Sequence, residues 1–311
     1  MTLERRRLGA SELEVSAFAL GSWRTYERIP RDQGVAVLHA AREHGIDFLE
    51  VARYNDTTGR APIPTGHSEV VFGEVFRRSG WPRHEVTIAE KLWWEFWPDQ
   101  TAAQELDASL ERTGLDHVDF VYSDPPPEEL SLEQVVAAVG DLLAAGKVRA
   151  WGIVNWPAAQ IAEAAQIARE QRVPTPCAAQ LPYSLAQRSP VEEEAMRTAL
   201  AGCAASVVAS FVLAGGILSG KYARGEDGRM REELADPRVA GALRLVERLC
   251  ALADDCGHTP AALAMAFAYQ SPGVATVLFG ATTPAQVAEN LRAADVDPAL
   301  MAELRALAVS T

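Results

Sequence analysis

Short apolar segments alternate with longer segments of helical periodicity along most of the chain. The apolar segments are rich in valine, isoleucine and phenylalanine without regular polar alternation, which is typical of parallel strands covered on both faces. We predict strands near 17–21 and at 47–52, 85–91, 118–123, 148–155, 178–183, 206–213 and 275–280. The intervening patterns predict helices at 32–43, 68–78, 101–112, 132–145, 158–172, 191–201 and 284–293.

Most of the predicted strands recur about every 30 residues, which is the size of one βα unit with short loops. Eight such units in 311 residues predict a single domain over residues 1–311, an α/β fold of the (β/α)8 TIM-barrel type. A long insertion is expected after the seventh strand, where residues 221–236 and a helix near 239–256 precede the last strand. A doubly wound open sheet is the alternative, but it normally begins with a GxGxxG turn after its first strand, which is absent here.

The composition is that of a globular protein, with 48% hydrophobic and 23% charged residues, and it excludes a disordered, collagen-like or coiled-coil chain. A net charge of −13 argues against general binding of nucleic acid or of anionic membranes, so a bound phosphate must be held by local donors. There is no apolar signal segment and no run of about 18 apolar residues, so we expect a cytoplasmic protein. The four cysteines lack CxxC or zinc-binding spacing, which favours reduced thiols over a disulfide and indicates no metal site.

Three residues near the predicted carboxyl ends of the second and third strands indicate acid–base chemistry, because the active sites of such barrels lie there. Lys91 ends the run VTIAEK, and Glu50, which ends the preceding strand, is its expected ion-pair partner. Tyr54 follows Glu50 by four residues. Because an ammonium stabilises a phenolate, we expect Lys91 to lower the pKa of Tyr54 and make it a general acid near neutral pH. A surface lysine and an ordinary loop tyrosine are the alternatives.

The segment GATTPAQVAEN has the strongest phosphate-binding pattern in the chain. Thr283 is expected to cap a helix with Pro284 in its first position and so present backbone N–H groups to an anion, although a helix that is only well capped fits equally. The first turns of this helix carry polar residues suited to an adenosine: Gln286, Glu289 and Asn290. Upstream, AGGILSGKY joins close-approach glycines to Lys221, a candidate pyrophosphate contact.

Two amides and a group of aromatic residues also follow predicted strands. Asn155 and Gln180 are placed to orient a carboxamide, with satisfied loop amides as the alternative. The aromatic residues are expected to form an apolar wall for a bulky substrate: Trp93, Trp94, Phe96, Trp97, Trp156 and Tyr183. A packed plug at the barrel mouth is the alternative for them.

The chain resembles the aldo-keto reductase family from end to end, most closely the branch that includes the potassium-channel β subunits. The matching segments, in chain order, are RRLGASELEVSAFALGSW, HSEVVFGEVF, TGLDHVDFVY, AAGKVRAWGIVNW, AAQLPYSL, LAGGILSGKY and GATTPAQVAENL. The resemblance implies a (β/α)8 barrel that binds NADPH without a Rossmann fold and transfers its hydride to the carbonyl of a small-molecule substrate.

By position, the resemblance implies cofactor contacts at several strand ends. The nicotinamide end would be lined by Gly21, Ser22, Trp23, Asn155 and Gln180. The remaining cofactor positions would be Phe211, Leu213, Gly215, Lys221, Arg231, Gly280, Thr282, Gln286, Glu289 and Asn290. Ser210 stands where the family usually stacks an aromatic residue on the nicotinamide, and residues 280–282 contain no cation for a 2′-phosphate. The resemblance makes NADPH the expected cofactor, and the missing cation weakens the preference for its 2′-phosphate and leaves NADH open.

The family's four catalytic residues are an Asp, a Tyr, a Lys and a His, and only Lys91 matches directly. Glu50 stands at the Asp position, and Tyr54 lies four rather than five residues beyond it, so the loop must bulge to restore the hydroxyl position. Asp124 replaces the His. An ionised carboxylate there would repel an oxyanion, whereas a protonated one can donate a hydrogen bond. Steroid 5β-reductases of the family carry a Glu at this position and reduce an activated C=C bond.

We therefore expect an NAD(P)H-dependent oxidoreductase that reduces a carbonyl or an activated C=C bond of a bulky small molecule, such as a natural product. In it Tyr54 supplies the proton, assisted by Lys91 and Glu50. The alternatives are a nicotinamide-nucleotide-binding regulatory protein without efficient turnover, and a redox-neutral enzyme that uses Asp124 as a base. The sequence predicts neither the substrate nor the oligomeric state.

Overall fold

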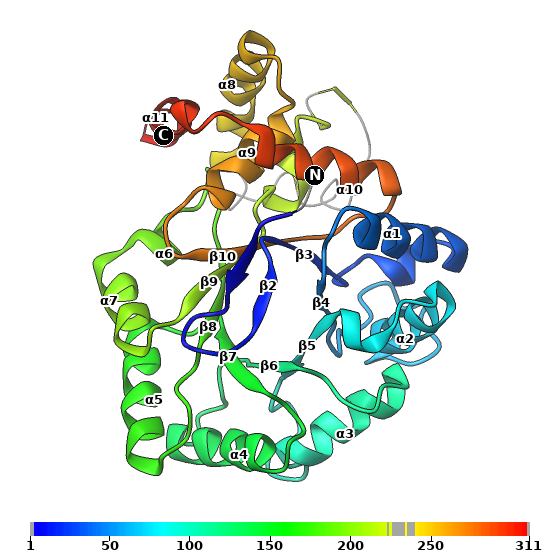
Figure 1. Cartoon of the computed structure of the whole chain (residues 1–311), viewed down its shortest axis with the longest axis vertical. Coiled ribbons are helices and arrows are strands. Elements are labelled where there is room, and N and C mark those ends of the chain that lie inside the picture. Colours follow the sequence, from blue (N-terminus) through cyan, green and yellow to red (C-terminus); the bar gives the residue numbers. More distant parts are fainter. Residues whose placement is uncertain (1–2, 223, 226–233, 235–239, 310–311) are drawn as a thin grey trace.

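Eight parallel strands form a closed barrel (Figure 1) within the part of the chain that the structure describes. The structure is a computed structural model that describes residues 3–222, 224–225, 234 and 240–309. The barrel strands are β3 (Phe18–Gly21), β4 (Phe48–Glu50), β5 (Thr87–Leu92), β6 (Phe120–Ser123), β7 (Ala150–Val154), β8 (Ala178–Pro182), β9 (Ser206–Ser210) and β10 (Val274–Phe279). The barrel closes because β10 pairs with β3, with Val277 opposite Phe18. The predicted (β/α)8 barrel is confirmed, and the open doubly wound sheet is excluded.

Helices cover the outside of the barrel between successive strands (Figure 1). They are α1 (Arg31–Glu43), α2 (His67–Ser79), α3 (Ala102–Thr113), α4 (Leu132–Ala144), α5 (Ala158–Gln171), α6 (Ser189–Glu192), α7 (Glu194–Cys203) and α10 (Pro284–Leu291). Single-turn 3-10 helices are η1 (Tyr26–Arg28), η2 (Arg83–Glu85), η6 (Arg292–Asp295) and η7 (Pro298–Leu300). The predicted helix 191–201 is two helices, because Glu193 has extended backbone with ψ of 140°. No helix in the described part of the chain is long and apolar enough to cross a membrane.

Side-chain caps explain where several helices begin. Thr101 before α3 and Ser131 before α4 each accept a hydrogen bond from the backbone N–H three residues on, and the glutamine there returns a bond to the cap. Thr283 caps α10 by accepting a hydrogen bond from the Gln286 N–H, with Pro284 in the first helical position, as predicted. These starts were therefore readable from the local sequence.

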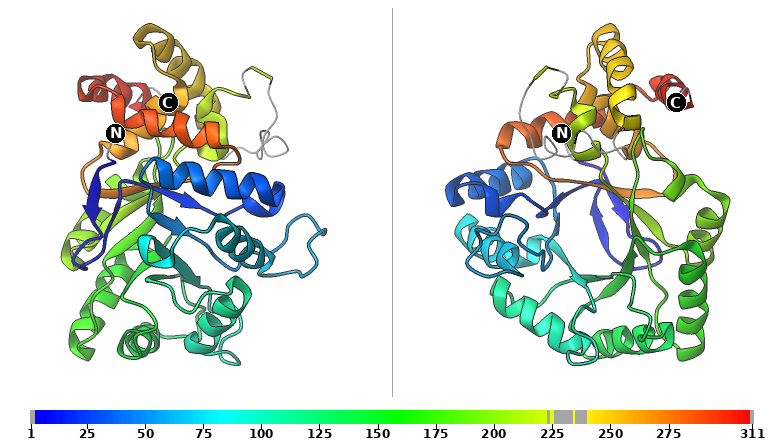
Figure 2. Two further views of the ribbon diagram at one scale, coloured as in Figure 1. Left: turned by 45° about the vertical axis from the view of Figure 1, so that its right-hand side comes forward. Right: turned by 180° about the vertical axis from the view of Figure 1, so that it is seen from behind.

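The longest connection between barrel strands lies between β9 and β10, where the insertion was predicted. It holds η3 (Ala214–Ser219), α8 (Ala240–Cys256) and α9 (Pro260–Tyr269). Arg231, a candidate phosphate contact, lies outside the described residues. α8 and α9 pack with α10 and α11 (Met301–Val309) on one side of the barrel (Figure 2). The sequence did not predict α9, because residues 261–268 are all buried and leave it without a polar face.

A hairpin that the sequence did not predict precedes the barrel, formed by β1 (Arg5–Arg7) and β2 (Glu14–Ser16). It joins three apolar side chains to the cluster inside the barrel: Leu8, Leu13 and Val15. Gly9 in its turn has φ of 52° and lies so close to the carbonyl oxygen of Cys177, just before β8, that no side chain fits there. The hairpin thereby covers the amino-terminal end of the barrel, and the candidate site lies at the opposite end.

Candidate active site

Three polar side chains meet at the carboxyl ends of β4 and β5. Glu50 is the last residue of β4, Lys91 lies near the end of β5, and Tyr54 lies in the loop after β4. The Tyr54 hydroxyl donates to Glu50 Oε1 at 2.7 Å, and Lys91 Nζ lies 2.6 Å from the same oxygen. Lys91 Nζ also donates to the Tyr54 hydroxyl oxygen at 2.9 Å. Glu50 is 2% exposed and Lys91 is 6% exposed, so the alternative of a surface lysine is wrong.

The loop after β4 brings the Tyr54 hydroxyl to these groups although it follows Glu50 by only four residues. Its backbone turns tightly, because the N–H of Tyr54 donates to the carbonyl oxygen of Ala52 at 2.8 Å. Ser68, in the first turn of α2, donates its hydroxyl to the same carbonyl at 2.8 Å and accepts from the Tyr54 N–H at 3.3 Å. The turn and its serine therefore set the direction of the tyrosine side chain.

The surroundings of Tyr54 raise the pKa of its hydroxyl well above the ordinary value. Burial is the largest cause, because it penalises the phenolate, and the carboxylate of Glu50 is the second. The prediction that Lys91 lowers this pKa is wrong, since burial and the Glu50 charge outweigh the nearby ammonium. Tyr54 consequently stays protonated near neutral pH, which is the state that a proton donor requires.

Asp124 follows β6 at the same end of the barrel. Its backbone N–H donates to the carbonyl oxygen of Leu92 at 2.9 Å, next to Lys91 in the neighbouring strand. Burial raises the pKa of the Asp124 carboxyl to about 6, while the Lys91 ammonium acts in the opposite direction. This carboxyl group therefore exchanges between its protonated and ionised forms in mildly acidic solution, where an ordinary aspartate is fully ionised.

Two buried glutamates that the sequence analysis did not single out support this end of the barrel. Glu105 on α3 accepts hydrogen bonds from the backbone N–H groups of Trp93 at 2.8 Å and Trp94 at 3.2 Å, and so holds the loop after β5. Glu90 in β5 is 1% exposed, and burial together with the charge of Glu69 raises its pKa well above the ordinary value. A charged residue inside an apolar strand was the available signal for Glu90, whereas Glu105 had none.

Arg53, also missed from the sequence, joins the loop that carries Tyr54 to the loop after β5. Its side chain is 4% exposed. One guanidinium nitrogen donates to the Thr65 hydroxyl at 2.6 Å and another to Glu95 Oε2 at 2.6 Å. The guanidinium also lies over the ring of Phe96, 5.0 Å from its centroid. These contacts hold the two loops together around the tyrosine.

The predicted aromatic wall is only partly present. Trp94, Trp156 and Tyr183 are buried in the core with at most 2% of their surface exposed, so the prediction that they face a bulky substrate is wrong. Trp94 turns inward because its backbone adopts φ of 60° and its indole N–H donates to a buried serine hydroxyl at 2.9 Å. Trp93 does border Tyr54, with its ring edge-on and the two centroids 5.7 Å apart.

The residues predicted to line the nicotinamide lie at or after the carboxyl ends of two strands and within a third. They are Gly21, Ser22 and Trp23 at the end of β3, Asn155 after β7, and Gln180 in β8. Ser22 Oγ and Gln180 Oε1 are buried, and neither has a hydrogen-bond partner in the described part of the chain. Because buried polar atoms are normally satisfied, this pair of atoms fits a polar ligand such as a carboxamide.

The residues predicted to hold the rest of the cofactor lie in the segments that follow β9 and β10, including η3 and α10. They are Phe211, Leu213, Gly215 and Lys221 on one side, and Gly280, Thr282, Gln286, Glu289 and Asn290 on the other. The amide oxygen of Gln286 is already used by the helix cap, where it accepts from the Thr282 N–H at 2.7 Å. Asn290 is 6% exposed, whereas Glu289 is exposed. Among the described residues, no group of histidine, cysteine and carboxylate side chains is arranged to hold a metal ion.

Known proteins resemble this chain along nearly its whole length. The family model described as the Aldo/keto reductase family matches residues 17–308. A probable voltage-gated potassium channel subunit beta of Oryza sativa subsp. japonica is 31% identical over 97% of this chain and 94% of its own length. Its counterpart in Arabidopsis thaliana is 30% identical over 96% and 93%, and a putative one in Schizosaccharomyces pombe is 31% identical over 96% and 90%. The chain therefore belongs to the aldo/keto reductase family.

Proposed function

We propose that this chain is an NAD(P)H-dependent reductase of a carbonyl or an activated C=C bond, with Tyr54 as the proton donor. The observation that carries the proposal is the three-way contact of Glu50, Tyr54 and Lys91 at the barrel mouth. Membership of the aldo/keto reductase family supports the class of reaction. When bound, NAD(P)H would supply the hydride.

The proposed role of Tyr54 follows from its protonation state and its two neighbours. The raised pKa keeps the phenol protonated until a substrate oxygen accepts its proton. Lys91 already donates to the phenol oxygen at 2.9 Å, so its ammonium stabilises the negative charge that develops there. Glu50 holds the ammonium in place through the 2.6 Å contact. Glu50 and Lys91 thus position and stabilise, and Tyr54 transfers the proton.

The protonation state of Asp124 would determine how the site interacts with the substrate oxygen. With its pKa raised to about 6, the carboxyl donates a hydrogen bond below that pH and repels an oxyanion above it. Reduction is therefore expected to be favoured in mildly acidic solution. NADPH is the first expected cofactor on the resemblance to the family, and NADH is the second, because residues 280–282 contain no cation for a 2′-phosphate and a preference for NADPH is thereby weakened.

The test combines cofactor binding with turnover. Quenching of tryptophan fluorescence should show binding of NADPH or NADH to the purified chain, and a panel of aldehydes, ketones and enones should reveal reduction. Tyr54→Phe should lower kcat by about a hundredfold or more, since it removes the general acid. Tyr269→Phe is the matched control, because that hydroxyl contacts Glu4 outside the proposed site. Turnover that is unchanged in Tyr54→Phe would exclude Tyr54 as the proton donor.

A nucleotide-binding regulatory protein is the second candidate function. The names of the relatives as channel subunits favour it, as does the carboxyl group of Asp124 at the position of the family's histidine. In that case NADPH or NADH binds tightly, but no member of the panel is reduced even in a single turnover. Slow reduction that is abolished by Tyr54→Phe would instead support the reductase.

A further inference from the structure

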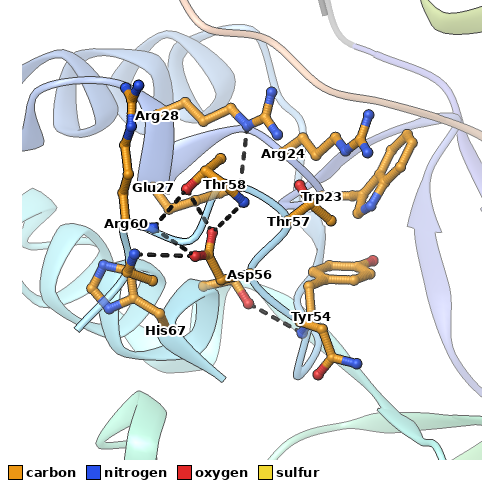
Figure 3. Close-up of a pocket in the computed structure, with 13 residues that line it drawn as sticks. Trp23, Arg24, Glu27, Arg28, Tyr54, Asp56, Thr57, Thr58, Arg60 and His67 are labelled. Atoms are coloured by element: carbon orange, nitrogen blue, oxygen red, sulfur yellow. Dashed lines mark hydrogen bonds and ion pairs between the residues drawn. The ribbon is translucent and has the colours of Figure 1, made fainter. Parts of the chain in front are cut away.

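A pocket of about 400 Å³ opens beside Tyr54 (Figure 3). The segment after β3 contributes Trp23, Arg24, Glu27 and Arg28. The loop after β4 contributes Tyr54 and the residues 55–58, 60 and 61, and the start of α2 contributes His67 and Ser68. In the view of Figure 3, the guanidinium groups of Arg24, Arg28 and Arg60 lie along the opposite side of the pocket from the Tyr54 ring. A ligand in this pocket therefore lies beside both Tyr54 and the arginines.

The pocket has an excess of positive charge in a chain whose net charge is −13. Among the residues that the structure describes, the lining contains three arginines, Arg24, Arg28 and Arg60, and two carboxylates, Glu27 and Asp56, which gives a formal charge of +1 with His67 neutral. Such a local reversal of sign attracts anions to the site that it surrounds. The contacts of the two carboxylates determine how much of this positive charge is available to a ligand.

The carboxylate of Asp56 accepts hydrogen bonds from its own loop. It accepts hydrogen bonds from the backbone N–H groups of Thr58 at 3.0 Å, Arg60 at 2.9 Å and Ala61 at 3.1 Å. These bonds hold the pKa of Asp56 well below its usual range. Asp56 therefore shapes the turn from which Arg60 projects. The Arg60 guanidinium forms no ion pair with any residue that the structure describes.

Glu27 also forms a hydrogen bond within its own loop. Its Oε2 accepts from the backbone N–H of Thr25 at 3.1 Å, whereas its Oε1 lies 3.7 Å from Arg28 Nε, beyond hydrogen-bond distance. This is a loose ion pair through Nε, and no hydrogen bond or ion pair within the described residues involves the two terminal guanidinium nitrogens of Arg28. The Arg24 guanidinium stacks over the ring of Trp23, 4.8 Å from the ring centroid, which holds it beside the pocket.

We propose that this pocket binds the anionic end of the substrate, so that the chain reduces small molecules with a reactive carbonyl at one end and a carboxylate or a phosphate at the other. The inference rests on the proposed function and names the substrate class of the same site. Guanidinium groups bind both anions through paired N–H donors, and these charge-assisted bonds are about twice as strong as neutral ones. The volume of about 400 Å³ suits a small molecule rather than a large natural product.

Two aldehydes of nearly equal shape test the charge requirement: 4-carboxybenzaldehyde and 4-nitrobenzaldehyde. We expect Arg28→Gln and Arg60→Gln each to raise KM for the carboxylate about tenfold and to change KM for the nitro compound less than about twofold. Arg60→Gln preserves the backbone N–H that Asp56 binds. Arg42→Gln on α1, whose guanidinium pairs with Glu85 outside the pocket, is the matched control. Equal effects on both aldehydes would overturn the inference.

A parallel pair of substrates separates the two anions. Glyceraldehyde 3-phosphate, compared with glyceraldehyde, reports on phosphate, and the aromatic pair reports on carboxylate. A larger effect of the two arginine variants on one of the charged substrates assigns the pocket to that anion. No effect on either charged substrate would contradict the proposal.

Binding of terephthalate and of neutral terephthalamide, measured by calorimetry on the full chain, needs no turnover. We expect terephthalate to bind better, and its affinity to fall about tenfold in each arginine variant and also with added salt. This result would support the pocket even if no aldehyde were reduced, so failure of the reductase is distinguishable from failure of the pocket. Undetectable terephthalate binding would overturn the inference. So would a loss of NADPH affinity in the arginine variants without a loss of terephthalate affinity, since the arginines would then serve the cofactor phosphates.

Discussion

Replacement of Asp124 by asparagine is expected to make the protein more stable at neutral and alkaline pH. The carboxyl ionises at about 3.8 in the unfolded chain and at about 6 in the folded one, because burial penalises its charged form. Between these values the folded state binds more protons than the unfolded state, so the free energy of unfolding falls as the pH rises. Asparagine has nearly the same shape and carries no charge, so it removes this loss.

The size of the effect follows from the difference between the two pKa values. At about 1.4 kcal/mol per pH unit, the rise from 3.8 to about 6 corresponds to at most about 3 kcal/mol. The Asp124 carboxyl is only partly buried, so screening by solvent reduces this value. The penalty is absent below about pH 4 and fully present above about pH 7.

Urea unfolding of the wild type and Asp124→Asn, followed by circular dichroism from about pH 4.5 to about pH 8, measures the difference directly. The stability advantage of the variant should grow as the pH rises through about 6 and then level off. Asp141→Asn, at an exposed position on α4, controls for the removal of one negative charge. Curves that stay parallel at every pH would show that Asp124 ionises alike in both states and would refute the reasoning.

Further substitutions test the fold and the site. Gly9→Ala should lower the free energy of unfolding by more than about 2 kcal/mol in chemical denaturation, because its Cβ would lie 2.0 Å from a carbonyl oxygen. Gly80 also has a positive φ of 64° but open space around it, so Gly80→Ala should lower the free energy of unfolding by only about 1 kcal/mol. Equal losses would contradict the close contact. Arg112→Met should cost about 3 kcal/mol or more, because Glu69 is fully buried and pairs with Arg112, and an unchanged melting temperature would contradict it. Asp124→His should extend reduction above about pH 6, since it restores a neutral donor; a pH profile unchanged from the wild type would argue against a role for this position.

The barrel was predictable because the burial pattern of each βα unit is visible in the sequence of that unit. Strands covered on both faces appear as apolar runs, helices with one covered face show helical periodicity, and their recurrence implies closure. The proximity of Glu50 and Lys91 was also predictable, since the carboxyl ends of adjacent parallel strands meet at one end of a barrel. Elements without such a pattern were missed: α9 is apolar on every side, and the hairpin strands β1 and β2 are only three residues long.

The electrostatics of the site were less predictable, because they depend on desolvation. From the sequence, the nearest charge to Tyr54 was expected to be Lys91, and the pKa was expected to fall. In the fold the hydroxyl is buried and donates to Glu50, so the pKa rises. The same cause raises the pKa of Asp124 to about 6, although a cation lies nearby. Burial of a single group is a property of everything packed around it, and no local pattern encodes it.

The sequence by itself therefore determined the barrel, the end of the barrel at which polar residues gather, and the cap of α10. Only the tertiary structure decided which side chains face the site. Trp94 and Trp156 turned into the core, and arginines from two separate loops line a pocket beside Tyr54. The physical reason is that periodicity reports which face of an element is buried, whereas loops have no period. The directions of loop side chains follow from contacts such as that of Ser68 with Ala52 and that of Arg53 with Glu95, which exist only once the elements are packed together.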